Sequence, residues 1–165
     1  MKVIYSWKVN SCQVQSSTVK AAPLLKKFAA RAAELAHLPE GDWVFSINFL
    51  DDRKMEKANM EYLGHEGTTD VITFSYLDDM ECVFPGDIGL ELLICSDFAE
   101  REGDRRKKSF FKRELALYIV HGVLHAAGYD DLSPAPRKLM RSAEFRLMKK
   151  LAAEFNFNDL FIAKN

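Results

Sequence analysis

The chain has 165 residues, of which 48% are hydrophobic and 28% charged, a composition typical of one globular domain with its own core. Its formal net charge of −1 argues against a generally basic nucleic-acid-binding protein. No apolar run approaches the roughly 20 residues of a membrane span, and the N-terminus lacks the apolar segment of a signal peptide. The three cysteines, Cys12, Cys82 and Cys95, are widely spaced and odd in number, which argues against a disulfide framework. We therefore expect a cytoplasmic protein with reduced thiols and no membrane partner.

The first half of the chain alternates strand-like and helix-like patterns. Asp51 and Asp52 are suitable caps for the second expected helix, and Gly64 and Gly67 bracket a loop. An acidic stretch from 78 to 86 contains Pro85 and is expected to be an exposed connection. The patterns predict strands over 2–9, 43–50, 71–74 and 87–95, and helices over 18–37 and about 52–63.

The second half of the chain is helical throughout. We expect helices over roughly 96–103, 109–127 and 135–156, with Ser109 as a cap of the central one. The body of that central helix is largely apolar, which predicts that it is buried. Pro134 and Pro136 precede the last helix, where proline is tolerated. Strands followed by helices indicate a single α+β domain over residues 1–165, in which about five helices pack on a small mixed four-stranded sheet.

The most informative stretch is the run HGVLHAAGYDD, which extends from His121 to Asp131. Two histidines four positions apart lie on one face of a helix, so His121 and His125 can bind the same metal ion. Gly128 readily adopts the left-handed conformation of a helix C-terminus, and the chain can then turn back to bring Asp131 to the ion. Asp130 is the alternative third ligand, and a pair of histidines bonded only to carbonyls is the alternative to any metal site. Two imidazoles and a carboxylate leave one position open, which is typical of a metal-dependent hydrolase.

Two groups of basic residues flank the histidine helix, and together they could form a phosphate-binding surface. The group before the helix comprises Arg101, Arg105, Arg106, Lys107, Lys108, Lys112 and Arg113. The group after it comprises Arg137, Lys138, Arg141, Arg146, Lys149 and Lys150. The alternative, which we favour for runs of charge, is that they are solvated helix faces offset by Asp97, Glu100, Glu102, Asp104 and Glu144.

Three blocks within about residues 43 to 150 carry a family resemblance. The first block contains Asn59, Tyr62, Gly64, Thr69, Asp70, Val71, Ile72, Thr73 and Phe74. The second is Gly86-Asp87-Ile88, and the third contains His121, Gly122, Leu124, His125, Gly128, Tyr129 and Asp130. In these blocks the chain resembles the YbeY family of bacterial single-strand-specific metallo-endoribonucleases, the rRNA maturation factors.

The resemblance implies a zinc-dependent endoribonuclease, with one zinc ion per chain, that acts in 16S rRNA 3′-end maturation and ribosome quality control. The implied partners are single-stranded RNA and the ribosome or a ribosomal protein. The implied metal ligands are His121, His125 and Asp131, which occupies the position of a third family histidine.

The chain departs from the family pattern at two positions. Asp131, an acceptable zinc ligand, replaces the third histidine. Its negative charge should make metal-bound water less acidic than in a three-histidine site. Two histidines with a carboxylate also suit Fe(II) or another divalent transition metal. Leu63 stands where the family usually has arginine, a natural phosphate clamp that leucine cannot replace. His65 could partly substitute for it, although an ordinary exposed loop histidine is the simpler interpretation.

The sequence leaves the catalytic chemistry open. Metal-activated water or the 2′-hydroxyl of the RNA could be the nucleophile, and Asp70, Glu61 and Asp87 are alternative bases that could equally be structural, so no general base is assigned. The histidine helix is zincin-like, yet Gly122 stands where zinc peptidases carry their glutamate base, which disfavours a metallopeptidase. A non-catalytic, metal-stabilised ribosome assembly factor is the other alternative.

The neighbouring blocks also contain aromatic side chains, which could stack on the bases of single-stranded RNA. They are Tyr62, Phe74, Tyr76 and Tyr129. Packing is the favoured interpretation for all of these except Tyr129, which lies directly beside the metal-binding run.

Overall fold

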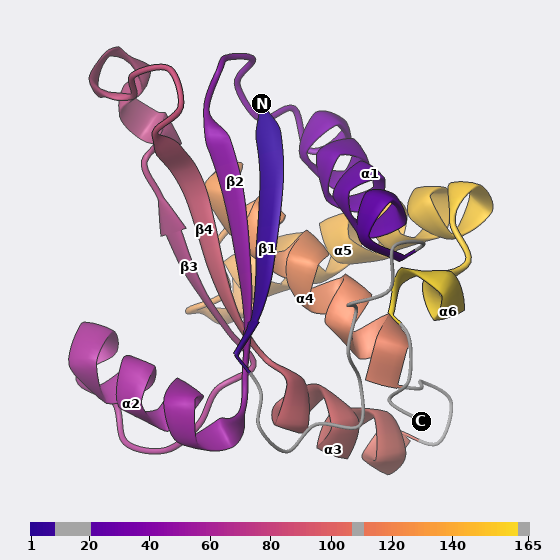
Figure 1. Cartoon of the computed structure of the whole chain (residues 1–165). Coiled ribbons are helices and arrows are strands. Elements are labelled where there is room, and N and C mark those ends of the chain that lie inside the picture. Colours follow the sequence, from indigo (N-terminus) through magenta and orange to yellow (C-terminus); the bar gives the residue numbers. More distant parts are fainter. Residues whose placement is uncertain (9–20, 107–110, 162–165) are drawn as a thin grey trace.

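The computed structural model describes residues 1–8, 21–106 and 111–161, which form a mixed four-stranded sheet with helices packed against it (Figure 1). The strands are β1 (Lys2–Lys8), β2 (Val44–Leu50), β3 (Val71–Ser75) and β4 (Ile88–Cys95). Their order in the sheet is β1-β2-β4-β3; β2 runs parallel to both β1 and β4, and β3 runs antiparallel to β4. The expected mixed four-stranded sheet is confirmed, and Cys12 and Ser109 lie outside the described residues.

The described part of the chain contains five helices of 11 residues or more and a short one after them. They are α1 (Ala21–Leu35), α2 (Asp52–Leu63), α3 (Ser96–Arg106), α4 (Phe111–Ala126), α5 (Pro134–Glu154) and α6 (Phe157–Leu160). The expected cap at Asp51 is confirmed, because its side chain accepts a hydrogen bond from the Lys54 amide at 3.0 Å.

Three details differ from the sequence-based expectation, the first being that α3 extends to Arg106 instead of ending near residue 103. The acidic connection after β3 begins with a 3-10 segment, η1 (Leu77–Cys82), in which Leu77 is buried against the core. The last helix was expected to reach residue 156, but α5 ends at Glu154 because Phe155 is extended. Asn156 then caps α6, its side chain accepting from the Asn158 amide. Local capping thus divides one apolar pattern into two helices.

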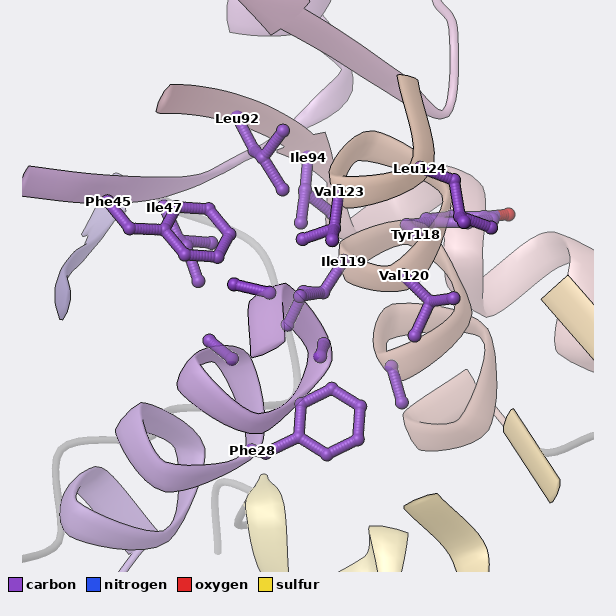
Figure 2. Close-up of a cluster of buried hydrophobic side chains, with 14 of the residues drawn as sticks. Phe28, Phe45, Ile47, Leu92, Ile94, Tyr118, Ile119, Val120, Val123 and Leu124 are labelled. Atoms are coloured by element: carbon purple, nitrogen blue, oxygen red, sulfur yellow. The ribbon is translucent and has the colours of Figure 1, made fainter. Parts of the chain in front are cut away.

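The main core lies between the sheet and the helices α1 and α4 (Figure 2). Phe28 of α1, Phe45 and Ile47 of β2, and Ile119 and Val123 of α4 are all completely buried there. A second, smaller cluster forms where α2 packs against the sheet, and it consists of Leu50, Met55, Ala58, Ile72 and Cys95. The expected burial of the central helix is therefore confirmed, and α4 is held rigidly along its length.

Gly122 allows α4 to approach the sheet closely. A Cβ atom at this position would lie 2.4 Å from Cδ2 of Leu92 and 3.1 Å from Oγ1 of Thr73. No real side-chain carbon lies at the shorter of these distances, so a larger residue here would have to displace the end of the Leu92 side chain or the helix itself. Close packing against the sheet therefore explains why position 122 does not carry the glutamate base of zinc peptidases.

No helix in residues 1–8, 21–106 and 111–161 is both long enough and apolar enough to cross a membrane.

Candidate metal centre

His121 and His125 come together on the last turns of α4. Their Nε2 atoms lie 2.9 Å apart, and the two rings meet nearly at right angles. An Oδ2 atom of Asp131 lies 3.5 Å from Nε2 of His121, and Oδ1 lies 3.7 Å from Nε2 of His125. The structure thus brings together all three residues for which the sequence predicted a metal site.

The other ring nitrogens of the two histidines are held by acceptors. Nδ1 of His121 lies 2.6 Å from Oε1 of Glu144 on α5, and Nδ1 of His125 lies 3.0 Å from the carbonyl oxygen of Tyr129. A carboxylate and a carbonyl can only accept, so both Nδ1 atoms carry the proton and donate. When the rings are neutral, both Nε2 lone pairs therefore point toward the Asp131 carboxylate, which is the tautomer that a metal ion requires.

The turn after α4 positions the aspartate. Gly128 has a φ of 91°, and its amide donates to the His125 carbonyl, while the Tyr129 amide donates to the Leu124 carbonyl. These two bonds form a Schellman motif, which reverses the chain at the helix end. The motif also explains why the Tyr129 carbonyl lies beside His125.

Asp130 and Asp131 have different surroundings. Oδ1 of Asp130 accepts from the amides of Asp131 at 2.7 Å and Leu132 at 3.1 Å, so this carboxylate stabilises the turn. The Asp131 carboxylate faces the histidines, and its backbone carbonyl accepts a hydrogen bond from Nε of Arg137 at 3.0 Å. The turn geometry therefore favours Asp131 over Asp130 as the third donor.

The two histidines differ in their protonation equilibria. Burial alone would lower the pKa of His121, but the hydrogen bond and charge of Glu144, together with Asp70 and Asp131, outweigh it and raise that pKa. The pKa of His125 is lowered by burial and by the neighbouring His121. One histidine of the pair thus gains a proton more readily than the other.

The donor set fits a metal ion. One atom from each of His121, His125 and Asp131 lies within 4.8 Å of the other two. In a tetrahedral zinc site with Zn–N bonds of about 2.0–2.1 Å, two nitrogens would lie about 3.3 Å apart, close to the separations found here. A metal ion could therefore bind between these three side chains with small adjustments.

Each of the two histidines lines a cavity of its own. One, of about 470 Å³, is lined by His121, Asp131 and Glu144, together with Asp70 of the first sequence block. The other, of about 260 Å³, is lined by His125, Leu63 and residues of β3. Leu63, the residue at the expected arginine position, thus faces the same cavity as a candidate metal ligand.

Of the three bases considered from the sequence, only Asp70 lines a cavity of the centre. Its Oδ1 atom accepts from the Val71 amide and the Thr69 hydroxyl, so it also anchors the start of β3. Glu61 is exposed on α2, and Asp87 accepts from the Phe84 amide in a different loop. His65 is exposed and lines neither cavity.

Of the four aromatic residues near the centre, Phe74 and Tyr129 are half-buried, whereas Tyr62 and Tyr76 are 56% and 53% exposed. Tyr62 and Phe74 contact each other with ring centroids 5.1 Å apart, and Tyr129 packs against the main core. Tyr76 is exposed but lines a different, acidic cavity. Packing thus accounts for the Tyr129 ring, and its backbone carbonyl contacts the candidate ligand His125.

The basic group before α4 is largely engaged within the protein. Arg101 pairs with Asp52, Arg105 pairs with Glu102, and Lys112 donates to the Asn158 carbonyl. Lys107 and Lys108 lie outside the described residues. For Arg101, Arg105 and Lys112, these contacts support the interpretation that the charges serve the fold.

Glu144 belongs to the candidate centre, although its sequence context did not predict this. It was regarded only as an offset to nearby basic charge, yet it contacts His121 and its side chain is only 18% exposed. One signal could have identified it: Glu144 lies on the apolar stripe of α5, four positions from both Met140 and Met148, which are buried. An acidic residue on a buried stripe needs a partner, and a histidine can provide one.

The sequence of the chain matches the family described as Endoribonuclease YbeY over residues 7–152. A relative with that name from Chlorobium phaeovibrioides is 36% identical over 143 residues, covering 86% of this chain and 90% of its own. Another from Elusimicrobium minutum is 32% identical over 158 residues, covering 92% of this chain and 99% of its own.

The solution structure of a Thermotoga maritima protein is similar in fold, with a TM-score of 0.57, at 20% sequence identity. The match covers 92% of this chain and 91% of that one, and it supports the fold alone. The extent of the family match and the identity to relatives across most of the chain decide the assignment: this chain belongs to the Endoribonuclease YbeY family.

Proposed function

We propose that this chain is a zinc-dependent endoribonuclease that cuts single-stranded RNA, with His121, His125 and Asp131 as the ligands of one zinc ion. The observation that carries the proposal is the pair of Nε2 lone pairs directed toward the Asp131 carboxylate, in a family named for endoribonuclease activity. The whole chain would act as a single metal-dependent hydrolase domain.

A bound zinc ion would supply Lewis acidity for a phosphate oxygen and acidify water in the open position. The residues of the chain would fix its surroundings. Glu144 and the Tyr129 carbonyl would hold the two imidazoles in the ligating tautomer. Asp70, in the same cavity as His121, could accept a proton there, although its bonds to β3 give it a structural role as well.

The biological setting is proposed from the resemblance in the three sequence blocks. We place the activity in 16S rRNA 3′-end maturation and ribosome quality control, in the cytoplasm, with the ribosome or a ribosomal protein as partner. The net charge of −1 suits a local rather than a general RNA-binding surface.

The test is zinc content per chain, measured by elemental analysis, combined with cleavage of a single-stranded RNA by the same samples. Wild type should hold about one zinc per chain, and a chelator should abolish its RNA cleavage, because the same three ligands hold the metal that cleavage requires. His121→Ala and Asp131→Ala should lose metal and cleavage together. His37→Asn is the matched control, because it removes a histidine far from the centre and asparagine tolerates the φ of 58° found there.

The alternatives make different predictions for these samples. Metal binding without RNA cleavage in wild type would favour the non-catalytic assembly factor. Leucine at position 63, where the family usually has arginine, is the feature that supports this alternative. Zinc retained by Asp131→Ala but lost by Asp130→Asn would move the third ligand to Asp130. Chelator-sensitive cleavage of peptides but not RNA would indicate the metallopeptidase.

A further inference from the structure

A basic hollow of about 560 Å³ lies along the exposed side of α5. It is lined mainly by Arg137, Lys138, Arg141, Ser142, Phe145 and Arg146. They form three pairs of neighbouring residues spaced four positions apart along the helix, so they lie on one face as a continuous stripe. From Arg137 to Arg146 the stripe extends about 14 Å at 1.5 Å per residue.

The four cations of this stripe lack ion-pair partners within the described part of the chain; Arg137 donates a hydrogen bond only to the backbone carbonyl of Asp131. No ion pair there involves Arg137, Lys138, Arg141 or Arg146, in contrast to Arg101 and Arg105 of the basic group before α4. The two acidic residues of the same helix are directed elsewhere, Glu144 to His121 and Glu154 to Arg31. A concave surface with four unpaired cations attracts a polyanion.

The stripe is continuous with the metal centre. Arg137 and Arg141 line both the basic hollow and the cavity that contains His121 and Asp131. Arg137 also bonds the backbone of Asp131, so the beginning of the stripe is joined to the turn that carries the third candidate ligand. A chain of phosphates that occupied the hollow would therefore lead into the candidate centre.

Phe145 indicates which polyanion the hollow accepts. Its side chain is 71% exposed on the stripe, between the cations Arg141 and Arg146. An exposed aromatic face beside phosphate-binding cations suits an unpaired base, which can stack on it, whereas the bases of a duplex are not accessible in this way.

We propose that the stripe on α5 binds the backbone of single-stranded RNA next to the scissile phosphate, with one base stacked on Phe145. This inference rests on the proposed function and specifies where its substrate lies. Lys138 and Arg146 contact phosphates at the far side of the hollow, and Arg137 and Arg141 contact those nearest the centre.

The experiment compares Lys138→Gln/Arg146→Gln with Lys149→Gln/Lys150→Gln. Both pairs remove two charges from exposed positions of α5, but Lys149 and Lys150 do not line the hollow. Arg137 is left intact because it supports the Asp131 turn. Binding of a short fluorescent oligoribonucleotide is measured by anisotropy over a range of salt concentrations, and KM and kcat are measured on the zinc-loaded chain.

Loss of two phosphate contacts should reduce the slope of log affinity against log salt by about 1.4 for Lys138→Gln/Arg146→Gln. The control pair should leave that slope near the wild-type value, and KM should rise more than kcat falls for the stripe variant. Phe145→Ala should weaken single-stranded RNA about 5- to 150-fold and a blunt duplex of the same sequence much less. Circular dichroism and urea unfolding confirm that α5 remains folded in each variant.

Equal slopes for the two charge pairs, or equal effects of Phe145→Ala on single strand and duplex, would overturn the inference. If wild type cleaves RNA and the stripe variant has an unchanged KM, the proposed nuclease activity stands and only the RNA-binding role of the stripe is rejected. If single-stranded RNA binds through the stripe but is not cleaved, the RNA-binding role of the stripe stands and the proposed nuclease activity is rejected.

Discussion

Nδ1 of His121 lies 2.6 Å from Oε1 of Glu144, a contact between residues 23 positions apart that joins the candidate metal helix α4 to α5. The turn that carries Asp131 lies between these two helices in the chain, and Arg137 of α5 bonds its backbone. The three candidate ligands are therefore supported from both sides, by the body of α4 and by the first half of α5. Displacement of α5 would disturb both His121 and Asp131.

Removal of the Glu144 carboxylate should weaken zinc binding. For Glu144→Ala we expect about 10- to 100-fold lower affinity, because His121 loses the acceptor that holds its ligating tautomer. Glu144→Gln keeps a carbonyl acceptor and should retain more of the affinity. Competition with a chromophoric chelator measures the zinc affinity of both variants. The control is Glu154→Gln, which changes another glutamate of α5, one that forms an exposed ion pair with Arg31 of α1. Wild-type affinity in Glu144→Ala would contradict this role.

Gly122→Ala should destabilise the fold by about 1–3 kcal/mol, the usual cost of an added methyl group in a packed core. The new carbon would lie 2.4 Å from Cδ2 of Leu92 and must displace that side chain or the helix. Urea unfolding of Gly122→Ala, Leu92→Val and the double variant measures the effect. The double variant should be more stable than the sum of the single changes predicts, because the smaller valine relieves the clash. Strict additivity would show that Leu92 is not the obstacle.

Acid should weaken the contact between α2 and α3. The guanidinium of Arg101 donates two hydrogen bonds to the Asp52 carboxylate and holds its pKa below the ordinary value. Because the folded-state pKa is the lower one, this pair stabilises the fold above the ordinary carboxyl pKa of about 4, and the stabilisation is lost as the pH falls through the folded value.

The pair is substantially exposed, so its contribution should be at most about 1 kcal/mol. We expect the difference in unfolding free energy between wild type and Asp52→Asn to shrink from about pH 6 to pH 3. Arg101→Gln should behave in the same way. A difference that is constant with pH would assign the effect of Asp52 to its uncharged contacts, such as that with the Cys95 thiol.

Leu63→Arg should increase RNA cleavage. Leu63 is 48% exposed and lines the cavity that contains His125, so an arginine there could reach a bound phosphate. One charged hydrogen bond of this kind should raise kcat/KM by about tenfold. Unfolding free energy should change by only about 0.5 kcal/mol or less, because the position is at the surface. Leu63→Gln provides a control of similar size without charge, and equal cleavage by the two variants would contradict the prediction.

Local sequence signals correctly identified most elements, because caps, glycines and apolar spacing act within a few residues. The Asp51 cap and the left-handed Gly128 were recognisable from residue type alone. Longer apolar patterns were less reliable at their ends. The expected last helix ran through Phe155, where the chain in fact becomes extended before α6.

What the sequence determined by itself was the pairing of His121 with His125, because the period of the α-helix places residues four apart on one face whatever surrounds them. The order β1-β2-β4-β3, the separate surroundings of Asp130 and Asp131, and the partner of His121 depended on packing between distant segments. Glu144 shows the reason most clearly: no local period relates positions 121 and 144, and only the packing of α5 against α4 brings a carboxylate to the histidine.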